Sequence, residues 1–266
     1  MAYAQSIKGA EIISSDSRQI YREMSIGTAK PSADEQAGIP HHFIDERSLR
    51  ESFSAGAFAE EANTRIDAIL ARNGTPIVVG GSTLYVHALI FGMAPLPPEA
   101  PEVRAALMHE LNEGHAETLF AELQRVDPIS ASTMDPTKTQ RLVRALEIYR
   151  STGRTRSAFI AEQEPPRFEY DVHVVTHPRP VLYERINTRV DRMLEAGLLN
   201  EVQAILTAGF SPDLNALQTI GYREPIAFLK GELSERDMIE LLKRNTRRFA
   251  KRQLTWFRKH FDFDEA

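Results

Sequence analysis

Two short apolar runs, at residues 12–13 and 77–79, restrict the fold most, because each is followed by small or polar residues that end it. Apolar runs of this length fit strands that are buried on both faces of a parallel sheet. Between them, Ser54 is suited to cap a helix, and an apolar stripe follows it at spacings of four, four and three (Phe58, Ala62, Ile66, Ile69). Strand, helix and strand in this order predict an α/β fold with a parallel sheet.

Asp16 stands in a polar turn directly after the first apolar run, with serines on both sides. In an open α/β sheet, ligands bind beyond the carboxyl ends of the strands, so a carboxylate here is placed to meet a substrate. Asp and Ser are also residues that favour the N-cap of a helix. From the residues alone, Asp16 is either a carboxylate that faces a ligand or the cap of a following helix.

The 266 residues, 42% of them hydrophobic, suffice for one large or two modest domains. The absence of cysteine excludes disulfides and cysteine-based zinc sites. His41 and His42 are adjacent, and adjacent side chains on a strand face opposite ways, so we predict no metal site there. With no apolar run of membrane-spanning length and no secretory signal, we expect a cytoplasmic protein without a membrane partner.

Two proline-rich stretches, near residues 95–101 and at 165–166, divide the chain. The sequence between them shows helical patterns and no strand signals. The helices expected there are 101–113, 115–125 and 137–150.

After the second proline-rich stretch, the valines of residues 170–176 predict a third strand that returns the chain to the sheet. We therefore predict an α/β domain formed by two separate parts of the chain, with an all-helical domain inserted between them. The predicted ranges are 1–94 for the first part, 95–167 for the inserted domain and 168–266 for the second part.

The last helical segment, from Ser234 onward, carries eight basic residues and no acid between Glu240 and Asp262. Its four like-charge pairs at i,i+4 each oppose the helix by about 0.2–0.5 kcal/mol, which indicates an anionic partner. Since the formal net charge of the chain is −5, RNA would have to bind such a local patch, but acids of the same chain could neutralise it instead. Both alternatives stay open. The aromatic residues of this segment are expected to be core anchors (Phe249, Trp256, Phe257).

Six blocks of sequence follow one another over nearly the whole chain. They are SSDSRQIY with IGTAKP at 14–31, PHHFID at 40–45, VGGSTLY at 79–85, QRLVRALE at 140–147, GYR at 221–223 and AKRQLTW at 250–256. In this order they resemble the signature of the tRNA dimethylallyltransferases, also called tRNA isopentenyltransferases. Six blocks in one order are far more specific than any single one of them.

The resemblance implies a P-loop NTPase-like parallel sheet flanked by helices, with an inserted helical domain that grips the anticodon stem-loop of tRNA. It implies a prenyltransferase that moves a dimethylallyl group from dimethylallyl diphosphate to N6 of the adenosine beside the anticodon. It also implies Mg²⁺ as cofactor, and we expect a monomer.

The same resemblance assigns roles to residues. Asp16 would be the base that takes the proton from N6, and Arg223 would stabilise the departing diphosphate, because a guanidinium stays charged and forks onto oxygens. Ser82 stands where the family usually has Thr and keeps the hydroxyl. The residues that the resemblance places against tRNA are Asp16, Ser17, Arg18, Gln19, Ser82, Arg104, Gln140, Arg141, Leu142, Val143, Arg144, Gly221, Tyr222, Arg248 and Lys251.

One family element, a G-x-x-x-x-G-K-[ST] loop that cradles phosphates and supplies a Mg²⁺ ligand, does not occur in the sequence. We expect a prenyltransferase without its leading strand and phosphate loop, through a misplaced start, a natural loss or a truncation. Fewer phosphate donors should make turnover of dimethylallyl diphosphate slow even where tRNA binds. A non-catalytic tRNA-binding remnant is the alternative, and a nucleotide kinase-like protein is a more distant third.

Overall fold

The computed structural model describes residues 1–263. The chain forms two compact units. One comprises Met1–Ile90 with the residues from Phe168 onward, and the other is Phe91–Arg167. Within the described residues, no helix combines the length and the apolar character needed to cross a membrane.

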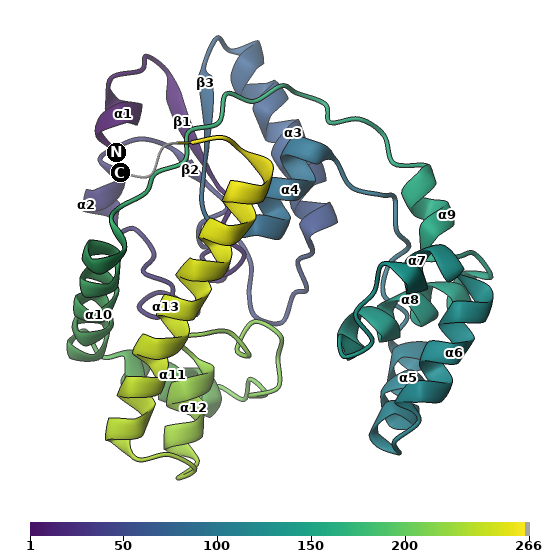
Figure 1. The fold of residues 1–266 in the computed structure, drawn as a ribbon. Helices are drawn as coiled ribbons and strands as arrows, with labels where there is room; N and C mark the ends of the chain where they lie inside the picture. Colours follow the sequence, from purple (N-terminus) through teal and green to yellow (C-terminus); the bar gives the residue numbers. More distant parts are fainter. Residues whose placement is uncertain (264–266) are drawn as a thin grey trace. The chain divides into compact units, whose positions relative to one another are not determined.

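The first unit is built on three parallel strands, which confirms the predicted α/β fold with a parallel sheet. The strands are β1 (Ala10–Ser14), β2 (His41–His42) and β3 (Thr75–Val79), in the order β2-β1-β3 (Figure 1). In the central strand β1, Ile12 is level with His41 on one side and Ile77 on the other, and Ile13 is 0% exposed. The turn that contains Asp16 therefore follows the central strand.

Helix α3 (Ala55–Ala71) connects β2 to β3, and its predicted cap and apolar stripe are confirmed. The Ser54 hydroxyl accepts the Ala57 N–H at 3.1 Å, and all four residues of the stripe are buried. Phe58 from this stripe packs on Phe43 and Tyr85, with ring centroids 4.9 and 4.3 Å apart. Short helices α1 (Ala2–Gln5) and α2 (Ala33–Gln36) and helix α4 (Thr83–Phe91) complete this part of the chain.

The prediction of a third strand at residues 170–176 is wrong. This segment is irregular and joins no strand, although its exposure alternates along the chain and Val175 is 86% exposed. β-branched residues favour an extended backbone, but a strand also requires hydrogen bonds to a neighbouring strand. In the sheet order β2-β1-β3, residues 170–176 pair with neither of the two edge strands.

Four helices end the first unit: α10 (Arg179–Glu195), α11 (Leu198–Thr207), α12 (Arg223–Leu229) and α13 (Glu235–His260). Ser234 caps α13, because its hydroxyl oxygen accepts the Asp237 N–H at 3.1 Å. The long helix α13 packs along both α10 and α12.

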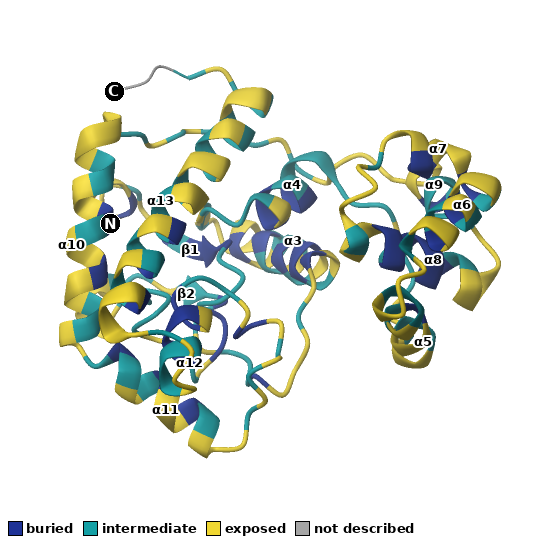
Figure 2. Ribbon diagram, turned by 60° about the horizontal axis from the view of Figure 1, so that its bottom comes forward, coloured by how far each residue is buried: buried dark blue, intermediate teal, exposed yellow. Residues whose placement is uncertain are grey.

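The second unit is all-helical, with α5 (Pro101–Asn112), α6 (Ala116–Val126), α7 (Pro128–Ser132), α8 (Thr139–Thr152) and α9 (Arg156–Ala161). The three helices expected from sequence correspond to α5, α6 and α8. Their apolar faces meet in one core (Figure 2). Leu107, Leu123 and Leu146 of this core are 0% exposed. The short helices α7 and α9 were not predicted, although Asp127 and Thr155 cap them through ordinary side-chain hydrogen bonds.

Candidate active site

Asp16 follows the central strand β1 and has two differently placed oxygens. Oδ1 accepts the backbone N–H groups of Arg18 at 2.8 Å and Gln19 at 3.2 Å. Within residues 1–263, Oδ2 accepts no hydrogen bond, and the side chain is half-buried. The residues that follow form a turn instead of a helix. Asp16 therefore caps a turn with one oxygen and leaves the other open to a ligand.

The turn after β3 is attached to the turn after β1. The Ser82 hydroxyl oxygen accepts the Ser17 N–H at 2.9 Å, and its O–H points to Ser17 Oγ at 3.3 Å. A Cβ at Gly80 would lie 2.7 Å from the Ser15 carbonyl carbon, so only glycine fits this approach. From α13, Gln253 donates its Nε2 to the Gly81 carbonyl at 2.8 Å. The glycines here serve close packing between two strand ends and a helix.

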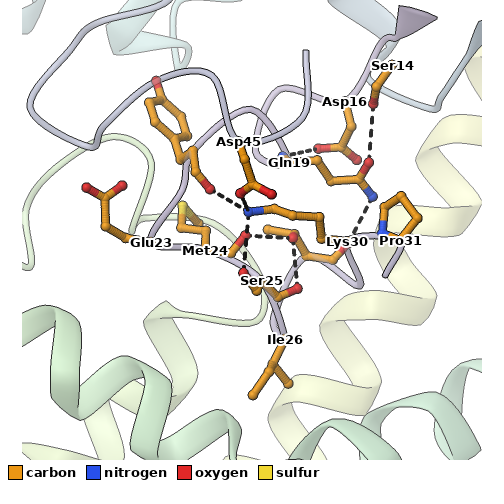
Figure 3. Close-up of polar contacts among 12 residues, drawn as sticks. Ser14, Asp16, Gln19, Glu23, Met24, Ser25, Ile26, Lys30, Pro31 and Asp45 are labelled. Atoms are coloured by element: carbon orange, nitrogen blue, oxygen red, sulfur yellow. Dashed lines mark hydrogen bonds and ion pairs between the residues drawn. The ribbon is translucent and has the colours of Figure 1, made fainter. Parts of the chain in front are cut away.

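Gln19 connects the Asp16 turn to the loop of residues 21–30 (Figure 3). Its side-chain oxygen accepts from the Ser14 hydroxyl at 3.2 Å, and its Nε2 donates to the Thr28 carbonyl at 3.2 Å. The side chain that the resemblance places against tRNA is thus also a structural link beneath Asp16.

Lys30 is a residue of this loop to which we assign no role from sequence. Its side chain is only 5% exposed, and the ammonium group lies against Asp45 and donates to the Tyr21 carbonyl at 2.7 Å (Figure 3). A buried cation needs such partners, because desolvation of an unpaired charge is costly. Lys30 therefore fastens the loop of residues 21–30 to the turn after β2.

Glu201 of α11 holds the middle of the loop and was also missed. Its carboxylate accepts the backbone N–H groups of Ser25, Ile26 and Gly27 at 3.0, 2.8 and 3.2 Å. It also accepts the Tyr222 O–H at 2.6 Å. Burial, together with the negative Glu201, raises the pKa of Tyr222, so this phenol stays protonated and keeps donating. Tyr222 is 0% exposed, and its side chain supports the loop from inside the protein.

Gly27→Ala is expected to destabilise the fold, because the new Cβ would lie 2.5 to 2.9 Å from three atoms of the Tyr222 side chain. Overpacking of a tight site costs about 1–3 kcal/mol of unfolding free energy. Urea denaturation followed by circular dichroism measures this loss. The matched control is Gly56→Ala in the first turn of α3, where a Cβ meets nothing closer than 3.8 Å. A Gly27→Ala protein as stable as the parent would show that the Tyr222 ring can move away.

Arg223 begins α12, one residue after Tyr222, and its side chain is 46% exposed. The preceding Gly221 has φ +99°, and a Cβ there would lie 2.9 Å from the Gly27 carbonyl oxygen. The 221–223 turn therefore touches the same loop as the Asp16 turn. Among residues 1–263, Asp16 and Arg223 share no hydrogen bond or ion pair.

Other cations surround the Asp16 turn. Arg18 donates to the Asn215 side-chain oxygen at 3.1 Å. Burial lowers the pKa of Arg189 on α10, and the negative charge of Asp16 opposes that shift. Arginine remains protonated at neutral pH in either case. The open oxygen of Asp16 therefore lies in a positively charged environment.

Comparison with known proteins gives one consistent result. The IPP transferase family profile matches residues 19–260. A tRNA dimethylallyltransferase from Salinibacter ruber is 54% identical over 96% of this chain and 79% of its own length. The chain belongs to the tRNA dimethylallyltransferase family. A Chlorobaculum parvum protein of the same name is 48% identical, over 96% of this chain and 84% of its own length.

Solved structures of the family have the same fold. A tRNA delta(2)-isopentenylpyrophosphate transferase from Staphylococcus epidermidis matches with TM-score 0.67 and 35% identity, over 100% of this chain and 86% of its own. A eukaryotic dimethylallyltransferase acting on tRNA matches with TM-score 0.79 and 30% identity, over 96% of this chain and 65% of its own. Members of the family are prenyltransferases, and these matches confirm the resemblance read from the six sequence blocks.

In the helical unit, the residues that the resemblance places against tRNA fall into two groups. Leu142 and Val143 are 1% and 0% exposed and belong to the core, so their side chains do not reach the surface. Arg104 and Arg144 both pair with Glu147, at 3.0 and 3.1 Å. The other two surface residues are Gln140, whose oxygen accepts from Arg104 at 3.2 Å, and the exposed Arg141.

Glu147 itself is fully buried and was missed by sequence reasoning. Its carboxylate also accepts the Ala100 N–H at 2.7 Å. A buried carboxylate with two arginines and a backbone donor is well satisfied. Glu147 therefore holds Arg104 and Arg144 at fixed places on the unit's surface.

The basic helix α13 divides into two regions. Lys243 pairs with Asp191 at 2.6 Å and Arg247 donates to the Asn187 oxygen at 2.6 Å, so these two cations are satisfied within the protein. Further along, four exposed cations have no ion pair among residues 1–263 (Arg248, Lys251, Arg252, Lys259). Internal neutralisation accounts for Lys243 alone, because Asn187 carries no charge, and it leaves the second region available to an anionic partner.

The expectation that Phe249 is a core anchor is wrong, since it is 42% exposed. It follows the buried Asn245 by one turn on the same face of α13. Asn245 lies against Glu224, in the first turn of α12, so the next turn of α13 extends beyond the start of that helix and loses its cover. Trp256 and Phe257 are half-buried and do not belong to the buried core, and the Trp256 ring centroid lies 4.4 Å from that of His260 and 5.1 Å from that of Phe257.

Mg²⁺, the cofactor implied by the resemblance, prefers several oxygen ligands in octahedral geometry. The described residues contain no group of three or more His, Cys, Asp or Glu side chains that could form a cage for it. Mg²⁺ is often held by one or two carboxylates together with substrate phosphates and water. The half-buried Asp16 is compatible with the role of one such carboxylate. The described residues do not form a metal site by themselves.

Proposed function

We propose that this protein transfers a dimethylallyl group from dimethylallyl diphosphate to N6 of the adenosine adjacent to the anticodon of tRNA, in the cytoplasm and with Mg²⁺. The observation that carries the proposal is the Asp16 carboxylate at the end of the central strand. One of its oxygens is fixed by backbone donors and the other is open. Membership of the tRNA dimethylallyltransferase family supplies the reaction class.

The adenine N6 is a poor nucleophile, because its lone pair is delocalised into the purine. As N6 forms a bond to C1 of the dimethylallyl group, the bond from C1 to the diphosphate oxygen breaks and N6 becomes cationic. Asp16 Oδ2 accepts the proton that N6 then loses, which makes the aspartate a general base. The two N–H groups that hold Oδ1 keep the carboxylate oriented while it acts.

Negative charge grows on the diphosphate as it leaves. Arg223, half-exposed at the start of α12, is the cation that we assign to this charge. Arginine suits the role because its planar, permanently charged guanidinium binds two phosphate oxygens at once.

tRNA binding would use cations from both units. Arg248, Lys251 and Arg252 on α13 lack internal ion pairs within the described chain, and Arg104 and Arg144 are held at the surface of the helical unit. Such cations bind phosphates and add affinity without reading sequence. The adenosine has to leave its stack to reach Asp16, and unpaired loop bases do this at little cost.

The test is transfer of radiolabelled dimethylallyl to an unmodified tRNA transcript in the presence of Mg²⁺. We expect label in the tRNA, and none when the adenosine beside the anticodon is replaced by guanosine. Binding of the transcript without any transfer would favour the alternative of a non-catalytic tRNA-binding protein. Label that survives the guanosine replacement would contradict the assigned acceptor.

A further inference from the structure

Glu224, next to Arg223, is a buried carboxylate surrounded by donors. Its side chain is 1% exposed. Oε2 accepts the Gly221 N–H at 3.0 Å, and Oε1 accepts both Arg223 Nε–H at 2.9 Å and the Asn245 side-chain amide at 2.8 Å. The three donors come from the 221–223 turn and from α13.

The arrangement specifies a carboxylate. A carboxylate only accepts hydrogen bonds, whereas a glutamine of the same shape carries one acceptor oxygen and one NH₂ donor. All three neighbours of Glu224 are donors, so a glutamine NH₂ would face at least one of them. Two donors facing each other in a buried place lose a hydrogen bond and leave polar groups unsatisfied.

The contact with Arg223 involves one edge of its guanidinium. Nε is bound to Glu224, while Nη1 and Nη2 have no hydrogen-bond partner among residues 1–263. The side chain is 46% exposed although its carboxylate partner is buried. The guanidinium is therefore fixed at its base and presents two outward NH₂ groups, the pair that binds two oxygens of a phosphate.

We propose that Glu224, supported by Asn245, is a positioning residue that orients Arg223 toward the departing diphosphate. The inference rests on the proposed function. A carboxylate in the first turn of a helix also stabilises that helix, and the bond to the Gly221 N–H fits such a role. The bonds to Arg223 Nε and from Asn245 have no part in helix stabilisation, and they tie the orientation of the arginine to α13.

The first test is a double-mutant cycle in single-turnover prenyl transfer, with Glu224→Gln, Arg223→Gln and both together. A group displaced by about 1 Å can cost roughly 100-fold in rate, so we expect Glu224→Gln to lower the rate by about 10–100-fold. The double variant should be no slower than Arg223→Gln alone, because Glu224 acts only through Arg223. Glu232→Gln, at an exposed position after α12, is the matched control and should retain the parent rate.

If the rate of the double variant falls by the product of the two single-variant factors, Glu224 and Arg223 act independently. That result would overturn the proposal and leave Glu224 a structural residue. Thermal unfolding of each variant separates loss of fold from loss of orientation. If Glu224→Gln unfolds, Asn245→Leu takes its place in the cycle, since it removes the Asn245 donor and keeps the Glu224 side chain. The same non-additivity with Arg223→Gln is expected, and its absence would count against the proposal.

The second measurement, calorimetric titration with inorganic diphosphate, does not depend on turnover. We expect weaker binding for Arg223→Gln and for Glu224→Gln, and no further weakening when both are changed. Diphosphate binding that is unaffected by Glu224→Gln would contradict the positioning role while leaving the proposed function intact. A parent protein that binds no diphosphate and transfers no dimethylallyl group would contradict the proposed function, and the inference with it.

Discussion

Asp16→Asn is expected to lower the single-turnover rate of dimethylallyl transfer by about 10²–10⁴-fold, the usual contribution of a general base. Asparagine keeps a side-chain oxygen that can accept the Arg18 and Gln19 N–H groups, so the turn after β1 should persist. The change removes the basic oxygen that accepts the proton from N6. Rapid-quench measurement with enzyme in excess over labelled substrate isolates this step.

The affinity of the Asp16→Asn protein for tRNA should stay within a few-fold of the parent value, because a base that acts in the transition state adds little to ground-state binding. Filter binding with the same transcript measures it. A transfer rate close to that of the parent would remove Asp16 from the mechanism. A rate loss accompanied by an equal loss of tRNA affinity would make Asp16 a binding residue.

Arg248→Glu combined with Lys251→Glu is expected to weaken tRNA binding and to reduce its dependence on salt. Each lost phosphate contact lowers the slope of log affinity against log salt by about 0.9 on duplex and about 0.7 on single strands. Loss of both contacts should therefore reduce the slope by roughly 1.4–1.8. Titrations of labelled tRNA at several salt concentrations give this slope directly.

The matched control for this pair is Lys230→Glu with Arg236→Glu, which makes the same change in net charge at exposed positions outside the basic region of α13. It should leave the slope near the parent value, because only contacts with phosphates release counterions. An unchanged slope in the Arg248 and Lys251 variant would mean that these cations do not contact tRNA. Equal slopes for variant and control would mean that only the overall charge matters.

The parts of the fold that follow from local pattern were predictable from sequence. The apolar run of β1 predicts a strand, and the Ser54 cap with the apolar spacing that follows predicts helix α3. The structure contains both. Residues 170–176 show the limit of this reasoning, because their valines favour extension but cannot specify a neighbouring strand.

The residues that hold the candidate site together were not predictable for the same reason. Glu201 meets its backbone donors across 174 to 176 positions of sequence, and Glu224 meets Asn245 across 21. No periodicity or motif encodes such separations. Lys30 and Glu147 do lie in the recognised sequence blocks, but only their burial shows that they support neighbouring groups.

The charge pattern of α13 predicts an anionic partner but does not show which of its cations are paired within the chain. The like-charge array predicts an anionic partner, yet Lys243 finds Asp191 within the chain, while Arg248 and Lys251 find no ion pair among the described residues. An internally neutralised helix and an RNA-binding helix share this sequence pattern, and only the packing of α10 against α13 separates the two regions.

The central claim is that this protein attaches a dimethylallyl group to adenosine in tRNA. Its most direct test is mass spectrometry of the nucleosides of tRNA from a bacterial strain that lacks its own tRNA dimethylallyltransferase and expresses this chain. The account predicts N6-dimethylallyladenosine in that tRNA, and its loss when Asp16→Asn is expressed at the same level. Unmodified adenosine in the presence of folded parent protein would contradict it.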